Sequence, residues 1–293
     1  MNAISYFFVR RFLNKANREH LARYPQLACY SFDLITTFIH LEGQYERDQL
    51  VLLARDVFPG LSDGSACLDV GANIGNHSVF FAQHFSKVIS FEPHPRNFAL
   101  LQVNAGLSDR IVPLNLGASS KAGTIEIVED RTNLAASSIE RSEGRDGNRV
   151  PFDLVRIDNV PEVQACEAVS FIKLDIEGHE AEAIEGARET IVRHHPVVML
   201  EVLKDEISGG TAASLEALRA LGYRHFHEPV EAGFIGRLPK SLRRLARGLA
   251  ALLTLRRIDK AGRLAEIERL EPRNYLMVLC SVEPPASAET SRP

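Results

Sequence analysis

The sequence predicts an α/β protein in which helices cover both faces of a parallel sheet. Short apolar runs alternate with helix-like segments of about ten to fifteen residues, which is the pattern of successive strand–helix–strand units. Several of these runs end on a glycine or an acidic residue, where a strand gives way to a loop. The chain has 293 residues, of which 45% are hydrophobic and 25% charged, an ordinary composition for a globular fold.

A helical extension, residues 1–60, is expected before the sheet, with its last helix ending near Pro59-Gly60. The main domain, residues 61–282, follows this extension. Its strands are expected at 66–70, 88–91, 111–116, 169–174, 197–202, 223–227 and 275–282. Helices are expected at 74–85, 97–105, 179–193 and 212–221.

Two stretches interrupt this alternation. Residues 124–129 and 150–157 each alternate as a strand does, and the polar segment 140–149 between them predicts a hairpin with a flexible tip. The insertion 228–273 separates the last two expected strands and contains a basic apolar helix, 242–258, with five arginines. The tail at 283–293 is rich in Pro, Ser and Ala and is expected to be disordered.

Charge and cysteine usage narrow the class of protein. The net charge of −4 gives no basis for binding nucleic acid. The four cysteines fit no zinc or redox spacing, so they are expected to be reduced. An apolar patch at residues 4–9 is followed by Arg10, Arg11 and Lys15, the reverse of the order in a secretory signal. We therefore expect a cytoplasmic protein.

The turn after the first expected strand, from Asp69 to Gly75, is typical of a nucleotide-cofactor site. Gly71 and Gly75 allow a close approach, and the next helix begins there with its backbone amides exposed. Asp69 ends the strand, where a carboxylate can accept from a cationic amino group. Roughly twenty residues later Glu92 ends the second strand, the position from which an acid binds both ribose hydroxyls of an adenosine.

Other cofactors would use similar architecture. A nicotinamide site has the spacing G-x-G-x-x-G, whereas this turn has G-x-x-x-G and lacks the glycine that approaches the pyrophosphate. Asp69 would repel a pyrophosphate but suits the ammonium group of a methionine moiety. A structural turn without a ligand is a further alternative, and the position of Glu92 counts against it.

Three segments together resemble the FkbM family of methyltransferases. These segments are CLDVGANIG (67–75), FEP (91–93) and FIKLDIEGHE (171–180). The element Gly43-Gln44-Tyr45-Glu46 is also similar to one that precedes the fold in relatives. The resemblance covers about residues 43–202 and implies a class I, Rossmann-like fold with a seven-stranded sheet. It also implies S-adenosylmethionine as donor and O-methylation, often of sugars or polyketide-type products.

The resemblance assigns roles to the turn residues by position. It implies that the amino-acid part of the donor is held by Asp69, Gly71, Asn73 and Gly75. It implies that Glu92 holds the ribose, and that Gly117 and Ala118 line the adenine.

Catalytic candidates lie in the second motif, which ends the fourth expected strand. Methyl transfer to a hydroxyl requires an aligned acceptor and removal of a proton with a high pKa. His179 is the preferred general base because histidine titrates near neutral pH. Asp175 is the next candidate, as base or as orienter, and Glu177 is the third. Glu201 at the end of the fifth strand is weaker evidence.

Alternatives for this motif are an acidic helix cap and a divalent metal held by Asp175, Glu177 and His179. A zinc-protease motif fails because Ala183 stands where the second histidine is required. No metal site is predicted.

The expected function is O-methylation of a hydroxyl on a sugar, glycan or glycolipid. The alternatives are methylation of a small natural product such as a polyketide, and a non-catalytic protein that retains the nucleoside pocket. The basic helix 242–258 is interpreted as a solvated helix, as a peripheral membrane contact or as an acceptor-binding lid.

Overall fold

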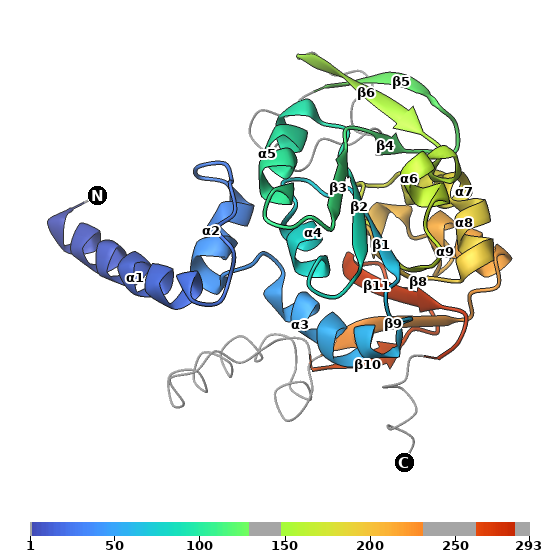
Figure 1. Ribbon diagram of the computed structural model, residues 1–293. Coiled ribbons are helices and arrows are strands. Elements are labelled where there is room, and N and C mark those ends of the chain that lie inside the picture. The colour runs from blue at the N-terminus through green and yellow to red at the C-terminus, as the bar shows by residue number, and fades with distance from the viewer. Residues whose placement is uncertain (1, 129–147, 231–261, 285–293) are drawn as a thin grey trace.

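The computed structural model describes residues 2–128, 148–230 and 262–284, and its centre is a twisted sheet of eight strands (Figure 1). The order across the sheet is β10-β9-β11-β8-β7-β1-β2-β3. The strands are β1 (Ala66–Val70), β2 (Lys87–Phe91), β3 (Ile111–Leu114), β7 (Val169–Leu174), β8 (Val197–Val202), β9 (His225–Val230), β10 (Arg263–Glu266) and β11 (Tyr275–Ser281). Neighbours from β3 to β8 are parallel, and β11 is antiparallel to both β8 and β9.

The seven expected strands are all present, and β10 is an addition to them. The prediction placed no strand within the insertion 228–273, yet β10 pairs with β9 from Arg263 opposite Val230 to Glu266 opposite His227. Four residues are too few to show an alternating pattern, so this strand depends on pairing with its neighbour. The expected seven-stranded sheet is thus extended by one strand at its edge.

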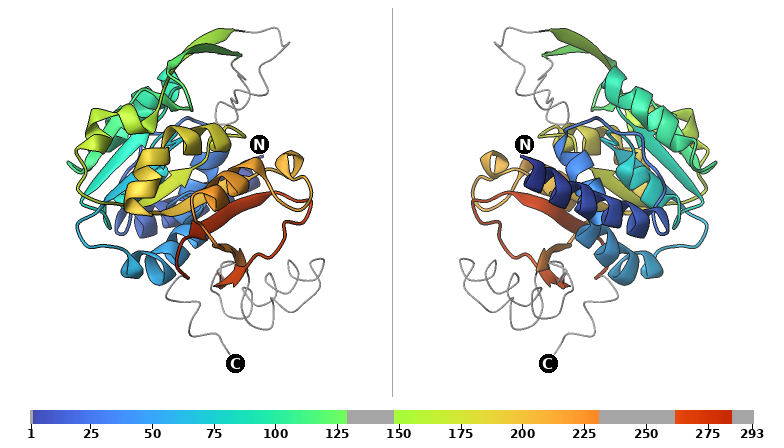
Figure 2. Two further views of the ribbon diagram at one scale, coloured as in Figure 1. Left: turned by 90° about the vertical axis from the view of Figure 1, so that its right-hand side faces the viewer. Right: turned by 90° about the vertical axis from the view of Figure 1, so that its left-hand side faces the viewer.

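Helices cover both faces of the sheet (Figure 2), and each face has its own apolar core. One face carries α3 (Arg47–Asp56), α4 (Asn76–Phe81) and α5 (Pro95–Ala105). The other carries α6 (Pro161–Gln164), α7 (Glu180–Gly186), α8 (Arg188–His194) and α9 (Ala213–Ala220). In β1 the side chains alternate between the two cores, with Leu68 in one and Cys67 in the other.

The single helix expected at 179–193 is divided into α7 and α8. A Cβ on Gly186, the last residue of α7, would lie 2.1 Å from the carbonyl oxygen of Ser119. Helix α7 therefore ends in close contact with another segment of the chain, and α8 starts a new direction from there. Neither the contact nor the change of direction is visible in the local sequence.

The helical extension expected at 1–60 contains α1 (Ala3–Leu21), α2 (Leu34–Glu42) and α3, followed by a 3₁₀ turn at Phe58–Gly60. Figure 1 shows α1 projecting away from the sheet beside α2. No helix in the described ranges is long and apolar enough to cross a membrane. All four cysteines are free, and Cys67, Cys166 and Cys280 are buried.

The expected hairpin is confirmed as β5 (Gly123–Val128) paired with β6 (Arg149–Val155), joined by β4 (Gly117–Ala118) in a small second sheet. The strand expected at 111–116 ends at Leu114, and β4 follows after a short turn. Most of the predicted hairpin tip, the basic helix 242–258 and residues 285–293 of the tail lie outside the described residues.

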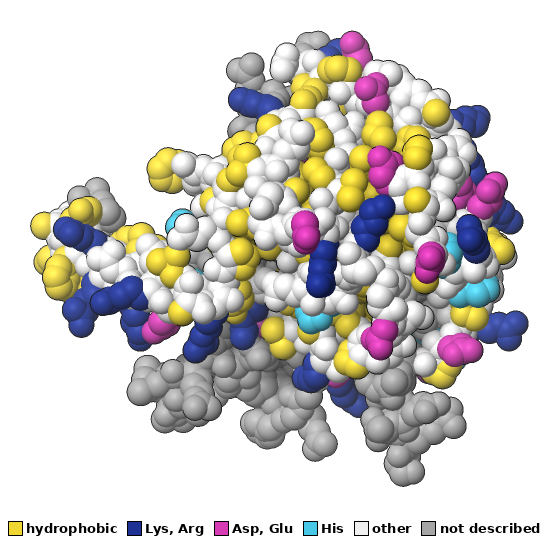
Figure 3. All heavy atoms as spheres, viewed as in Figure 1, with side chains coloured by type: hydrophobic (Ala, Val, Ile, Leu, Met, Phe, Trp, Pro, Cys, Tyr) yellow, Lys and Arg dark blue, Asp and Glu magenta, His cyan; other side chains and the backbone are white. Residues whose placement is uncertain are grey.

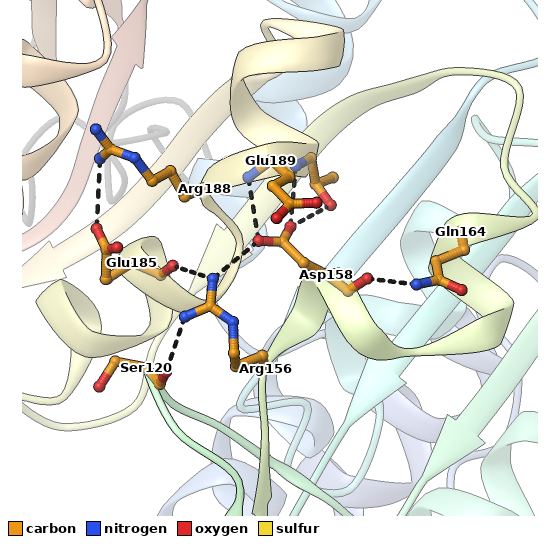
Figure 4. Close-up of polar contacts among 8 residues, drawn as sticks. Ser120, Arg156, Asp158, Gln164, Glu185, Arg188 and Glu189 are labelled. Atoms are coloured by element: carbon orange, nitrogen blue, oxygen red, sulfur yellow. Dashed lines mark hydrogen bonds and ion pairs between the residues drawn. The ribbon is translucent and has the colours of Figure 1, made fainter.

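An ion pair between a half-buried arginine and a buried aspartate joins this second sheet to α7 and α8 (Figure 4). Arg156 follows β6 and donates to the carbonyl oxygens of Ser120 (2.8 Å) and Glu185 (3.1 Å). Its guanidinium also pairs with Asp158, whose side chain is only 2% exposed. The Asp158 carboxylate accepts from the backbone N–H groups of Glu189 and Thr190 at the start of α8 and from the Thr190 hydroxyl. Asp158 thus caps α8 and fixes the segment after β4.

Replacement of Asp158 by Ala is expected to destabilise the protein by about 2–4 kcal/mol, because buried donors and the Arg156 cation lose their acceptor. Urea unfolding measures this change. Arg188→Ala is the matched control in the same region, since its ion pair with Glu185 is about half exposed. The control is expected to cost under about 0.5 kcal/mol. Equal effects of the two substitutions would contradict the assigned role of Asp158.

Candidate active site

A cavity of about 250 Å³ lies at the carboxyl ends of β1, β2, β7 and β8. Ligands of open α/β sheets bind at this edge, where the loops after the parallel strands meet. Eight of the ten predicted site residues line the cavity: Gly71, Asn73, Glu92, Gly117, Ala118, Asp175, Glu177 and His179. Asp69 and Gly75 support its walls from behind.

One end of the cavity is defined by Glu92, which is 6% exposed. Its Oε2 accepts from the backbone N–H of Asn73 (2.9 Å), and its Oε1 accepts from the backbone N–H of His94 (3.0 Å) and from Asn97 Nδ2 (3.4 Å). Burial raises the pKa of Glu92 to about 7, against the lowering effect of these hydrogen bonds. Oε2 retains capacity for a further donor, whereas Oε1 already has two, of which the Asn97 contact at 3.4 Å is the weaker and the one that a ribose hydroxyl could replace.

An apolar slot adjoins Glu92. Its walls are Pro93, Leu116, Phe152 and Leu154, with Gly117 and Ala118 between them. A Cβ on Gly117 would lie 2.7 Å from Leu154 Cδ2 and 3.3 Å from Pro93 Cβ, so any side chain there would crowd the slot. A flat apolar base such as adenine fits these surroundings. The hairpin strand β6 supplies Phe152 and Leu154, a contribution that the sequence analysis did not identify.

The turn after β1 requires its glycines for two different reasons. Gly71 has φ +79°, and a Cβ there would lie 1.9 Å from the carbonyl oxygen of Asp175, so the two motifs touch at this point. Gly75 has φ +87° and precedes α4, and a Cβ there would lie 2.8 Å from Leu101 Cδ1 in α5. Gly71 thus lines the cavity, whereas Gly75 permits the packing of α5 behind it.

The carboxylate of Asp69 forms an ion pair with Lys173 of the same chain. Its side chain is fully buried, with Oδ2 accepting from Ser78 Oγ (2.5 Å) and Oδ1 lying 3.3 Å from Lys173 Nζ. Lys173 also donates to the carbonyl oxygen of Gly71 (2.9 Å) and pairs with Asp175 Oδ2 (3.2 Å). Burial lowers the pKa of Lys173, but the carboxylates of Asp175 and Asp69 raise it above its ordinary value overall. Asp69 therefore reaches the cavity only through Lys173.

The second motif forms a tight turn between β7 and α7. Glu177 has φ 57° and Gly178 has φ 105°. Glu180 is 1% exposed, and its carboxylate accepts from the backbone N–H groups of Ile176 and Gly178, each at 3.0 Å. Burial raises the pKa of Glu180 to about 8. The capping role considered for this motif thus belongs to Glu180, whereas Glu177 and His179 line the cavity.

His179 is held from both sides of its ring. Its Nε2 lies 3.0 Å from Ser119 Oγ, and its Nδ1 lies 3.7 Å from Glu182 Oε2. Ser119 directly precedes Ser120, whose carbonyl oxygen accepts from Arg156. The ion-pair network of Figure 4 thus also positions the partner of His179.

The other end of the cavity is acidic. Glu201 lines it together with Asp175, Glu177 and Glu46. Burial raises the pKa of Glu201 to about 8, and the charges of these three neighbours and of Glu180 add to the effect. A cation is the ligand that such surroundings favour most.

The N-terminal extension completes this acidic end with Tyr45 and Glu46. The backbone N–H of Tyr45 donates to Asn76 Oδ1, and Asn76 Nδ2 donates to the Tyr45 carbonyl oxygen, both at 3.1 Å. Glu46 has φ 55° and pairs with His77 Nε2 at 3.3 Å. Burial and the nearby carboxylates raise the pKa of Tyr45. The GQYE element therefore belongs to the site, a role that the sequence analysis left unassigned.

Strained backbone is concentrated at the cavity. Of the five non-glycine residues with positive φ in the described ranges, Glu46, Asn73 and Glu177 line it. Such conformations cost free energy and persist where the surrounding structure enforces them, often at functional sites. In the part of the chain that the structure describes, no group of His, Cys, Asp and Glu side chains is arranged to hold a metal ion.

The sheet order and the cavity at the strand ends are those of the class I, Rossmann-like methyltransferase fold. The model of the FkbM methyltransferase domain matches residues 69–225, which is more than half of the chain. The chain therefore belongs to the FkbM methyltransferase family.

Similar proteins include the methyltransferase sdnD of Sordaria araneosa, 28% identical over 185 residues (52% of this chain and 70% of sdnD). The hexuronic acid methyltransferase AglP of Haloferax volcanii is 29% identical over 147 residues (48% of this chain and 56% of AglP). The 2-O-methyltransferase NoeI of Sinorhizobium fredii is 25% identical over 146 residues (43% of this chain and 58% of NoeI). The chain thus matches little more than half the length of AglP and NoeI.

Among solved structures, a methyltransferase FkbM from Methylobacillus flagellatus matches 64% of this chain and 47% of its own chain. The sequence identity is 22% and the TM-score is 0.38.

The raised pKa of Glu201 predicts that stability falls as the pH rises from about 5 to about 9. In this interval the folded protein retains a proton that the unfolded chain releases near the ordinary glutamate pKa. Gln resembles the protonated carboxyl group, so Glu201→Gln is expected to match the wild type near pH 5. Near pH 9 it is expected to melt at least about 2–4 °C higher, a shift that corresponds to roughly 1 kcal/mol.

Thermal unfolding at the two pH values tests this expectation. Glu216→Gln is the control, because hydrogen bonds from Thr211 and Arg219 lower the pKa of this exposed carboxyl. The control is expected to gain nothing at high pH. Equal melting temperatures of Glu201→Gln and wild type near pH 9 would refute the assignment.

Proposed function

We propose that this protein transfers a methyl group from S-adenosylmethionine to a hydroxyl of a sugar or glycan. The observation that carries the proposal is the arrangement of one cavity with two unlike ends. Glu92 and an apolar slot lie at one end, and the carboxylates of Glu46 and Glu201 lie at the other. His179 lines the same cavity and contacts Ser119, the residue that follows Ala118 of the slot.

The residues present fit the proposed donor. Glu92 would hold the ribose hydroxyls, and the slot around Gly117 would hold the adenine. Gly71 and Asn73 would border the amino-acid part, and the acidic end suits a cationic sulfonium. When bound, S-adenosylmethionine supplies an electrophilic methyl group. Asp69 is proposed to act indirectly, by fixing Lys173 and the turn.

The chain's own side chains supply the remaining chemistry. The acceptor hydroxyl must lose a proton, and His179 is the proposed base that accepts it. Ser119 and Glu182 orient the imidazole ring. Lys173 fixes the Asp175 carboxylate beside the turn, from where Asp175 is proposed to orient the acceptor. Tyr45 and α2 form the wall that limits access of water to this end.

The names of two relatives support a hydroxyl acceptor on a sugar. AglP is named for hexuronic acid and NoeI for 2-O-methylation. Acceptor binding is proposed at the acidic end, between Tyr45 and Glu201, because the opposite end is the one proposed to hold the nucleoside.

Isothermal titration tests the cofactor. We expect micromolar binding of S-adenosylhomocysteine and no binding of NAD. Glu92→Ala is expected to weaken binding about 10²-fold, because hydrogen bonds to a charged group contribute about 1.5–3 kcal/mol each. Glu126→Ala, an exposed residue of β5, is the control and should leave affinity unchanged. Folded protein that binds neither S-adenosylmethionine nor its homocysteine product would overturn the proposal.

Methyl transfer from a labelled donor to a panel of neutral, acidic and amino sugars tests the base. His179→Ala is expected to lower the rate about 10²-fold or more while the affinity for S-adenosylhomocysteine is retained. His225→Ala is the control, since His225 lies on β9 and does not line the cavity. A near-normal rate of His179→Ala would remove His179 from this role. If the protein binds the donor but transfers the methyl group to no sugar, the proposed sugar specificity is wrong.

A further inference from the structure

Helix α1 exposes an unusual amount of apolar surface. Six large apolar side chains lie within nine consecutive residues, and each is between 45% and 70% exposed: Ile4, Tyr6, Phe7, Phe8, Val9 and Phe12. Single exposed apolar residues are common on proteins, but a contiguous patch of this kind marks an interaction surface.

This surface makes no contribution to the core of the protein. Within α1, Ala16 is the one buried residue, and the helix contacts the rest of the molecule at α2. Figures 1 and 2 show α1 lying outside the layers of the sheet. The apolar side chains of residues 4–12 are therefore available to an external partner.

The charge of the same segment is strongly positive. Residues 2–24 contain five basic side chains, Arg10, Arg11, Lys15, Arg18 and Arg23, and one acidic side chain, Glu19, whereas the whole chain has a net charge of −4. Figure 3 shows hydrophobic and basic side chains side by side on the projecting arm. The partner of this arm is thus expected to be both apolar and anionic.

We propose that α1 binds the surface of a membrane that contains anionic lipids. The aromatic and aliphatic side chains of its first three turns enter the boundary between headgroups and acyl chains, and the basic side chains contact lipid phosphates. A helix that combines these side chains lies in the plane of the interface. A second copy of α1 is a poorer partner because two segments of this positive charge repel each other.

Exposed apolar residues also occur between α1 and the cavity along the chain, so binding of α1 to a membrane would affect which acceptors reach the site. Phe32, in the segment that connects α1 to α2, is fully exposed. Leu34, the first residue of α2, is 61% exposed and lines the cavity. Exposed apolar side chains thus occur at the cavity wall as well as on α1. If the proposed methyl transfer is correct, this arrangement favours an acceptor carried on a lipid, although binding of α1 to lipid does not depend on it.

Co-sedimentation of the full chain with vesicles tests the proposal. Vesicles of phosphatidylcholine alone are compared with vesicles containing 30% phosphatidylglycerol, a composition of the kind that attracts basic helices. We expect binding to the anionic vesicles, weakened by added salt. Phe7→Ser/Phe8→Ser is expected to reduce this binding at least about tenfold, since two large apolar side chains are lost. Arg11→Glu/Lys15→Glu is expected to reduce it similarly.

The matched control is Val103→Ser/Val192→Ser, which removes two apolar side chains of similar exposure from α5 and α8. The control is expected to bind vesicles as the wild type does. Thermal unfolding of every variant reports folding independently of activity, so failure of the proposed catalysis would not be confused with failure of this proposal.

Three results would overturn the proposal. The first is absence of wild-type binding to anionic vesicles. The second is binding that survives both α1 substitutions, which would assign it to another part of the chain such as 242–258. The third is a dimer in sedimentation velocity that dissociates on Phe7→Ser/Phe8→Ser without vesicle binding by the wild type, which would assign α1 to self-association.

Discussion

The ammonium group of Lys173 is the interaction on which the two motifs of this protein depend. It contacts Asp69 at the end of β1, Asp175 after β7 and the carbonyl oxygen of Gly71, all within 3.3 Å. A buried cation without these partners would carry a large desolvation cost, so the three groups hold one another in place. The turn proposed to face the donor and the turn that carries the proposed base are thus parts of one electrostatic unit.

This unit also determines the charge of the cavity. Lys173 pairs with Asp69 and Asp175, and Glu46 pairs with His77, while the charges of Glu46 and Glu177 act on Glu201. Burial and the charges of these neighbours favour a bound proton on Glu201, and the same surroundings favour a bound cation. The positively charged sulfonium of the proposed donor is such a cation. Binding of this cation is therefore expected to stabilise the folded protein.

The sequence predicted the elements whose signals are local. The ends of β1, β7 and β8 were correct because each is a short apolar run bounded by polar residues or glycine. The break between α7 and α8 was not predictable, since it depends on contact of Gly186 with Ser119, far away in the chain. For the same reason Phe152 was not predicted in the apolar slot.

Lys173 did carry a signal, because a lysine inside an otherwise apolar strand requires buried partners. Asp69 was assigned to the ligand because its charge was visible in the sequence, whereas the direction of the Lys173 side chain was not.

The added strand β10 affects a different property, the tendency of sheets to aggregate through their edges. It places only four residues with charged ends, Arg263 and Glu266, at one border of the sheet. At the opposite border Pro113 removes a backbone donor from β3. Among the strands that the structure describes, neither border therefore offers the long unpaired ladder on which fibrils grow.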